Sequence, residues 1–247
     1  MEKNNELRLA VLIDADNVPH ASIKAMLEEL AKYGIPTFKR IYGDWTKPTV
    51  SGWKNVLLEN AITPIQQYSY TSGKNATDSA MIIDAMDILY SGRVDGFCLV
   101  TSDSDFTRLA TRLREAGMKV FGMGEKKTPA PFITACDKFI YIEILETENE
   151  QAKENRKEKA SPNSIKKIDK TLINLISSTV TDLADESGWA FLGDVGNLLL
   201  KKQPDFDARN YGFKKLFPLI KSTGKFDTDQ RHTEKENIKL VYIRVKN

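Results

Sequence analysis

The chain has 247 residues, of which 41% are apolar and 28% are charged, and its formal net charge is +2. This composition is typical of a globular protein with room for one medium and one small domain, and the charge neither requires nor excludes a nucleic-acid partner. No apolar run approaches the roughly 20 residues of a membrane span, and the polar start MEKNNELR shows no signal peptide. We therefore expect a cytoplasmic protein without a membrane partner.

The first part of the chain alternates short apolar strands with helical patterns. Strands are expected at Leu9–Ile13, Pro36–Tyr42, Thr63–Tyr68, Gly96–Val100, Lys119–Gly122 and Phe139–Ile144. Helices are expected at Pro19–Tyr33, Thr49–Asn60, Asn75–Tyr90, Phe106–Ala116 and Ala130–Asp137. This alternation predicts an α/β fold whose mostly parallel sheet is covered on both faces.

The composition changes after this α/β region. Residues 1–147 form the first expected domain, and residues 148–170 mix charges with Ser, Pro and Asn, as expected of a linker. Residues 171–247 combine helical spacing with a final alternating segment, Asn237–Val245, that resembles an edge strand. We expect a small winged-helix-like domain there.

Histidine and cysteine offer little chemistry in this chain. His20 and His232 are far apart in sequence, and neither has a Cys or His nearby, so a zinc site or a histidine acid–base pair is improbable. Cys98 and Cys136 are expected to be free buried thiols. Acidic side chains must therefore carry any polar chemistry.

Two expected strands end in pairs of carboxylates. Asp14 and Asp16 follow the first strand, and Asp103 and Asp105 follow the fourth. In a strand order such as 3-2-1-4-5 these two strands are neighbours, and ligands bind beyond their carboxyl ends. We therefore expect the acids to meet in one crevice, which Asp78 can reach from the first turn of a helix.

Such a cluster needs a counter-charge. Two carboxylates about 5 Å apart repel by roughly 3 kcal/mol at an effective dielectric near 20. A hard divalent cation, Mg²⁺ or Mn²⁺, removes this repulsion and can support displacement at phosphorus. Asn17 could hold a water or a substrate oxygen there, and Lys74 could meet a phosphate.

Each of these residues also has a purely structural interpretation. Asp103, Ser104 or Asp105 could cap the helix that follows, and Asp78 could interact with a helix dipole. The remaining polar candidates could be loop residues or ordinary helix acids, namely Asp14, Asp16, Lys74, Asp84 and Asp87.

The motifs LIDADN, YGDW, GKNATD, VTSDSDF and GMKVFGMG stand in this order along the chain. Together they make residues 8–145 resemble an NYN domain of the PIN-like nuclease superfamily. The resemblance implies a Rossmann-like PIN fold and metal-dependent RNA cleavage. It assigns the metal and the catalytic chemistry to Asp14, Asp78, Asp103 and Asp105, with Asn17 as a further catalytic residue. Asp16 is secondary, and Asp84 matches a helix acid of uncertain role.

The C-terminal segment GWAFLGDVGNLLLKKQPDFDARNYGFKKLFPLI resembles an OST-HTH (LOTUS) domain. Such modules are associated with RNA binding or protein docking, so RNA and a protein are the two partners implied. The candidate RNA-binding residues are Lys201, Lys202, Arg209, Tyr211, Lys214, Lys215 and Lys221. The alternative is that the basic residues form a solvated face and that Tyr211 belongs to the core.

The sequence thus predicts a metal-dependent endoribonuclease that acts on single-stranded RNA, whose flexible backbone permits in-line attack. Trp45 and Tyr42 could stack on a base beside the crevice or belong to the core. One alternative is an RNA-binding regulator without turnover. Another is a haloacid-dehalogenase-like phosphatase, although Val18 stands where that class has a small hydroxyl residue. No oligomeric state is predicted.

Overall fold

The computed structural model describes residues 6–46, 52–68, 76–145, 166–232 and 239–246. The chain divides into two compact units, Met1–Lys159 and Ala160–Asn247, which are described separately. No helix among the described residues is long and apolar enough to cross a membrane.

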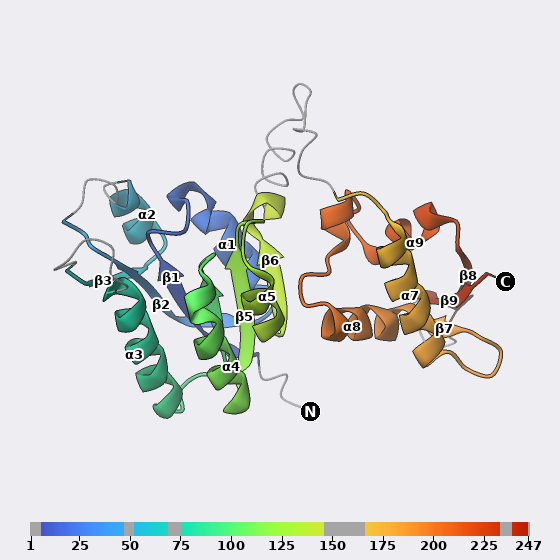
Figure 1. Cartoon of the computed structure of the whole chain (residues 1–247), viewed down its shortest axis with the longest axis horizontal. Helices are drawn as coiled ribbons and strands as arrows, with labels where there is room; N and C mark the ends of the chain where they lie inside the picture. Colours follow the sequence, from blue (N-terminus) through green and yellow to red (C-terminus); the bar gives the residue numbers. More distant parts are fainter. Residues whose placement is uncertain (1–5, 47–51, 69–75, 146–165, 233–238, 247) are drawn as a thin grey trace, which may run out of the picture. The chain divides into compact units, whose positions relative to one another are not determined.

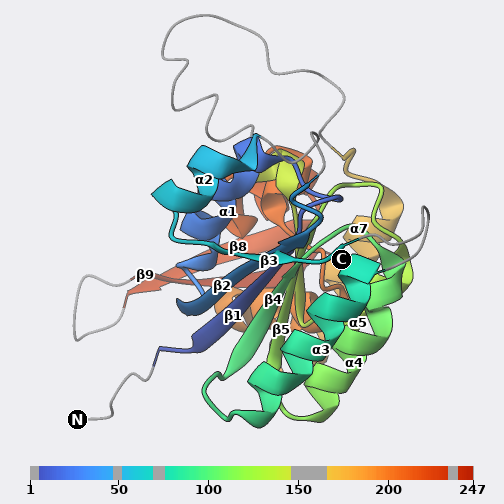
Figure 2. The same cartoon turned by 90° about the vertical axis from the view of Figure 1, so that its left-hand side faces the viewer.

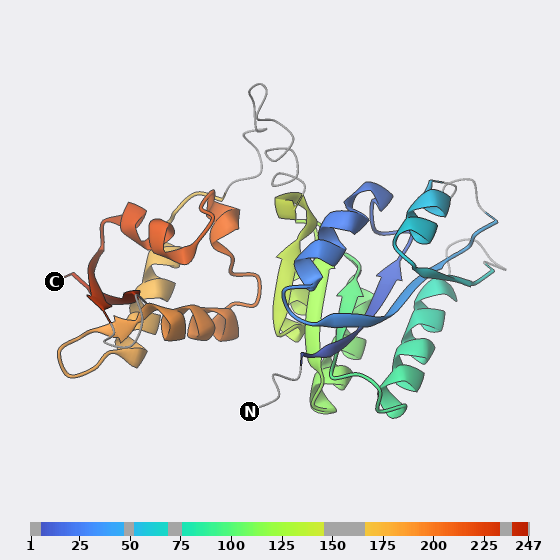
Figure 3. The same ribbon diagram turned by 180° about the vertical axis from the view of Figure 1, so that it is seen from behind.

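The first unit is built on a parallel sheet. Its strands are β1 (Arg8–Asp14), β2 (Ile35–Gly43), β3 (Thr63–Gln66), β4 (Gly96–Val100), β5 (Lys119–Gly124) and β6 (Lys138–Tyr141). They lie in the order β3-β2-β1-β4-β5-β6, and every neighbouring pair is parallel, as Figures 1 and 3 show from opposite sides. The predicted α/β fold is confirmed, including the adjacency of the first and fourth strands.

Helices cover both faces of this sheet (Figure 2). On one face α1 (Ile23–Leu30) and α2 (Trp53–Glu59) pack against alternate residues of β1. On the other face lie α3 (Ala76–Tyr90), α4 (Thr107–Glu115) and α5 (Ala130–Ala135). The two apolar layers explain why β1 and β4 are continuous hydrophobic runs, since both sides of these strands are buried.

Two strand predictions are too long. The strand expected at Thr63–Tyr68 ends at Gln66 in β3. The last strand was expected to reach Ile144, but β6 ends at Tyr141 and residues 142–145 are helical. Ile142, Ile144 and Leu145 are all buried in this helical turn. Periodicity cannot separate a short buried strand from a short buried helix, which is the reason for the error.

An ionic hydrogen-bond network attaches α3 to β2. The two oxygens of Asp84 accept hydrogen bonds from the guanidinium of Arg40 and the hydroxyl of Tyr42. Tyr42 is fully buried, so the interpretation that it stacks on a base is wrong. Burial and the neighbouring Asp84 carboxylate raise the pKa of Tyr42, which keeps its hydroxyl protonated as a donor. Asp84 is therefore a structural helix acid.

Replacing Asp84 with alanine should lower the free energy of unfolding by about 1–3 kcal/mol, because Tyr42 and Arg40 would each lose their acceptor. Urea unfolding followed by circular dichroism measures the change. Asp87→Ala, on the exposed face of the same helix, is the matched control and should have little effect. Equal losses in the two variants would contradict a specific role for Asp84.

The second unit combines helices with a small antiparallel sheet. Its helices are α7 (Lys170–Leu183), α8 (Leu192–Lys202) and α9 (Leu216–Thr223), and its strands are β7 (Ala190–Phe191), β8 (Phe226–His232) and β9 (Lys239–Val245). The strand order is β7-β9-β8, so the final strand is the middle strand and not an edge strand. The edge-strand prediction failed because β7 has only two residues and β8, FDTDQRH, lacks apolar alternation.

The start of this unit lies within the segment 148–170. The backbone N–H of Lys166 donates to the carbonyl of Asn210 at 2.7 Å, and its Nζ lies 3.1 Å from Asp205. Asp169 caps α7 by accepting from the N–H of Leu172. The rest of the expected linker, residues 148–165, lies outside the described residues.

Candidate metal centre

The site begins at Asp14, the last residue of β1, whose side chain is only 1% exposed. Its Oδ2 accepts hydrogen bonds from the Asn17 amide at 2.6 Å and from the Thr101 hydroxyl at 3.0 Å. Its Oδ1 accepts from the backbone N–H of Asp16 at 3.1 Å. Burial raises the pKa of Asp14, and the donors from Asn17 and Thr101 oppose that rise. Asp14 thus joins the ends of two adjacent strands, because Thr101 directly follows β4.

Thr101 extends this connection to the next acids. Its hydroxyl oxygen also accepts from the backbone N–H of Asp103 at 3.1 Å. Asp103 Oδ1 in turn accepts from the N–H of Asp105 at 2.9 Å and caps the short 3₁₀ helix Ser104–Phe106. The capping interpretation of Asp103 is therefore correct for one oxygen. A carboxylate has two oxygens, so capping does not prevent it from binding a cation as well.

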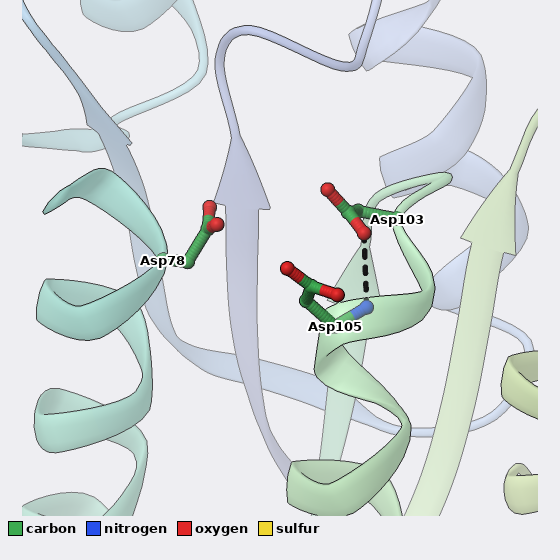
Figure 4. A group of neighbouring side chains, drawn as sticks. All are labelled: Asp78, Asp103 and Asp105. Carbon is green, nitrogen blue, oxygen red and sulfur yellow. Dashed lines mark hydrogen bonds between the residues drawn. The ribbon is translucent and has the colours of Figure 1, made fainter. Parts of the chain in front are cut away.

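Three carboxylates converge beside this loop. Asp78, Asp103 and Asp105 each place an oxygen within 4.8 Å of the others. Figure 4 shows Asp78, in the first turn of α3, facing the segment that carries Asp103 and Asp105. Asp78 and Asp103 are half-buried and Asp105 is exposed, so the group is accessible from solvent.

The electrostatics of this group are those of several carboxylates that lie close together. The pKa of Asp78 is raised to about 6, first by burial and then by the negative charges of Asp14, Asp103 and Asp105, in that order. All the donor atoms are carboxylate oxygens, a set that suits Mg²⁺ or Mn²⁺ and not a soft metal. The residues present therefore fit a hard divalent cation.

Asp14 differs from the other three acids. It was expected to be a metal ligand, but the group whose oxygens meet consists, among the described residues, of Asp78, Asp103 and Asp105. Asp14 is a buried acceptor for Asn17 and Thr101, and its charge acts on Asp78 as well, so its role as a metal ligand stays a prediction. Thr101 is the site residue that the sequence analysis missed, because nothing in the motif VTSDSDF distinguishes this hydroxyl from the serines that follow it.

The other candidates in the first unit occupy varied positions. Asn17 is half-buried beside Asp14, and Asp16 is exposed. Trp45 packs against the core, and its indole N–H donates to the carbonyl of Ile65 at 3.0 Å, which limits its ring as a stacking surface. Lys74 lies outside the described residues.

Several of the candidate RNA-binding residues in the second unit have partners within that unit. Arg209 forms a fork with Asp207 at 3.0 and 2.8 Å, and the Nζ of Lys202 lies 2.7 Å from Asp182. Tyr211 packs against the core beside Phe206, in agreement with its core interpretation. The candidates that are exposed on the surface are Lys201, Lys202, Lys214, Lys215 and Lys221, and of these Lys202 pairs with Asp182.

Comparisons with known proteins agree with this architecture. The chain matches the NYN domain over residues 8–143 and the OST-HTH/LOTUS domain over residues 163–238. Since the first match covers more than half of the chain, the protein belongs to the NYN domain family, which is part of the PIN-like nuclease superfamily. The OST-HTH/LOTUS match points to RNA binding.

Two solved structures resemble parts of the chain. A protein of Nitrosomonas europaea is 34% identical, with a TM-score of 0.31, over 37% of this chain and 86% of its own. A protein of unknown function from Vibrio parahaemolyticus is 20% identical, with a TM-score of 0.48, over 57% of this chain and 96% of its own. No protein with a curated function matches the chain.

The carboxyl of Asp78 should titrate with a pKa of about 6 in metal-free protein, compared with an ordinary value of 3.8. Asp105→Asn should lower this pKa, because it removes one of the negative charges that raise it, and so should Mg²⁺. Carboxyl ¹³C NMR measures the titration, with Asp87→Asn as the control that leaves it unchanged. An Asp78 pKa near 4 in the metal-free protein would contradict the cluster.

The same shift predicts how stability depends on pH. The folded state binds the Asp78 proton more tightly than the unfolded state, so the contribution of Asp78 to the free energy of unfolding should fall as pH rises from about 4 to about 6. Comparing urea unfolding across this range in wild type and in Asp78→Asn isolates that contribution. A difference between the two proteins that does not vary with pH would contradict the shift.

Proposed function

We propose that this protein is a divalent-metal-dependent endoribonuclease that hydrolyses phosphodiester bonds in single-stranded RNA. The observation that carries the proposal is the convergence of Asp78, Asp103 and Asp105 at the carboxyl ends of the central strands of an NYN domain. An open parallel sheet binds its ligands at this place.

The residues have distinct roles in this proposal. Asp78, Asp103 and Asp105, with Asp14 as the fourth predicted ligand, would hold Mg²⁺ or Mn²⁺, and the bound ion would supply water activation and stabilisation of negative charge at phosphorus. The side-chain nitrogen of Asn17 donates a hydrogen bond to Asp14. The side-chain oxygen of Asn17 is then the atom that can accept a hydrogen bond from water or RNA. Asp14 holds Asn17 in position, and Thr101 holds the backbone of Asp103.

The environment of Asp14 weighs against phosphatase chemistry. A haloacid-dehalogenase-like enzyme would use the first acid of LIDADN as its nucleophile. Here that carboxylate is buried and accepts three hydrogen bonds, so its oxygens are poorly placed to attack a phosphoryl group.

The proposed domain division assigns cleavage to residues 1–147 and RNA capture to residues 171–247, with residues 148–170 as the linker between them. The OST-HTH/LOTUS match supports capture, and a tether raises the local concentration of RNA near the acidic site. Two free buried cysteines support a cytoplasmic location, where thiols stay reduced.

Asp78→Asn and Asp105→Asn should each reduce cleavage of a labelled single-stranded RNA in Mn²⁺ or Mg²⁺ by about 100-fold or more, since losing even an outer partner of a metal site costs up to that amount. Gel electrophoresis of the products measures the rate. Asp87→Asn, an exposed acid on the same helix as Asp78, is the control and should cleave like wild type.

Chelation of the divalent ion should stop cleavage by wild type as well. Wild-type protein that binds RNA but never cleaves it would show the regulator without turnover. Equal cleavage by wild type and both variants would refute the acidic site as the catalytic centre.

Deleting residues 148–247 should raise the RNA concentration needed for half-maximal binding while metal-dependent cleavage remains detectable. The reason is that the remaining unit keeps all three clustered carboxylates but loses the tethered binding domain. Fluorescence anisotropy in EDTA measures binding, and a cleavage assay at high protein concentration measures the remaining activity. An unchanged affinity would refute the division of labour.

A further inference from the structure

The small sheet of the second unit has an aromatic face that does not belong to the core. Along β9, Val241, Ile243 and Val245 point into the apolar core, so Tyr242 and Arg244 lie on the opposite face. Tyr242 is paired with Phe191 of β7, and their ring centroids are 5.7 Å apart. Both rings are half-buried without contributing to the core cluster.

Two arginines lie on the rings of this face. The guanidinium of Arg231 is 4.1 Å from the centre of the Tyr242 ring, and that of Arg244 is 4.8 Å from the Trp189 ring. Their side chains remain 43% and 44% exposed. Flat guanidinium groups on flat rings form an extended stacking surface that still offers N–H donors to a ligand.

The turn before β7 is shaped to present Trp189. The carboxylate of Asp185 accepts hydrogen bonds from the backbone N–H groups of Ser187 and Trp189 and from the Ser187 hydroxyl. Gly188 has a φ of +82°, and a Cβ there would lie 3.1 Å from Cδ of Arg244. A glycine is therefore needed both for the turn and for the passage of Arg244 across it to the indole.

Ion pairs hold the arginines of this face in place. The cations of β8, β9 and the residue after them are Arg231, Lys239, Arg244 and Lys246. Two carboxylates, Asp227 and Asp229, oppose them, and each pairs with an arginine at about 3 Å. These pairs hold the guanidinium groups over the rings. Because Asp185 also acts on Arg231, the face carries no clear excess of charge, and stacking is the interaction that it offers.

We propose that this aromatic face, formed by Trp189, Phe191, Arg231, Tyr242 and Arg244, binds single-stranded RNA by stacking unpaired bases on its rings and guanidinium planes. The inference rests on the proposed RNA substrate and specifies where the second unit holds it. Single-stranded RNA suits the face because unpaired bases expose flat surfaces, whereas paired bases are stacked on each other. This face differs from the RNA-binding residues predicted from the sequence, among which Arg209 and Lys202 pair with acids and Tyr211 packs against the core.

The test measures binding of full-length protein to a labelled single-stranded RNA in EDTA, and to an abasic strand of equal length. Tyr242→Ala and Trp189→Ala should each raise the Kd for RNA about tenfold or more, while the Kd for the abasic strand stays nearly unchanged. Tyr242→Phe should bind like wild type, because it keeps the ring. Melting curves check that the alanine variants are folded.

Phe217→Ala is the matched control, because Phe217 is a half-buried ring on α9, away from the aromatic face, that also carries a cation, Lys221, at 4.6 Å. It should retain RNA affinity. If Tyr242→Ala and Trp189→Ala both bind RNA as tightly as wild type, the inference is overturned. A face that docks a protein would give this result. An equal loss with Phe217→Ala, or an equal loss for the abasic strand, overturns it as well.

The same RNA incubated with wild type and Mn²⁺ keeps this inference distinct from the proposed function. Cleavage by wild type, together with unchanged binding by the variants, refutes only the aromatic face. Wild-type protein that neither cleaves nor binds the RNA refutes both.

Discussion

The buried carboxylate of Asp14 is the constraint on which the site depends. A charge in the protein interior is costly unless hydrogen bonds compensate it, and here the three donors come from the loop after β1 and from the end of β4. The pairing of β1 with β4 is therefore a condition for stabilising Asp14. Thr101 then transmits this placement, because the hydroxyl that donates to Asp14 also accepts from the backbone of Asp103.

The acids of the first unit divide into a structural set and a set suited to chemistry. Asp84 is matched by Arg40 and Tyr42 and fastens α3 to the sheet, whereas Asp78, six residues earlier on that helix, faces other carboxylates. Burial and these neighbouring carboxylates together raise the pKa of Asp78. A divalent cation would replace repulsion with attraction at this point, so the cluster is a place where binding free energy can be gained from charge alone.

The second unit uses its charges differently. Most of its arginines and several lysines are paired with acids inside the unit, so formal basic residues there are not equivalent to a phosphate-binding surface. In its small sheet, the ion pairs with Asp229 and Asp227 hold the guanidinium groups of two arginines on aromatic rings. In the proposed function, such a surface would hold unpaired bases by stacking, while the acidic site would act on the RNA backbone.

The sequence by itself determined the α/β fold and the convergence of strand-end acids, because buried parallel strands leave a periodic pattern and the chain order of βαβ units restricts which strands are neighbours. It could not determine the fate of Tyr42, the helical turn at residues 142–145 or the central position of β9, since apolar residues look alike wherever they are buried. Only the tertiary structure showed which groups hydrogen-bond to Asp14 and which acid pairs with Arg209. The reason is that the role of a polar side chain is decided by its partners, and those partners lie far away in sequence or in elements too short to leave a pattern.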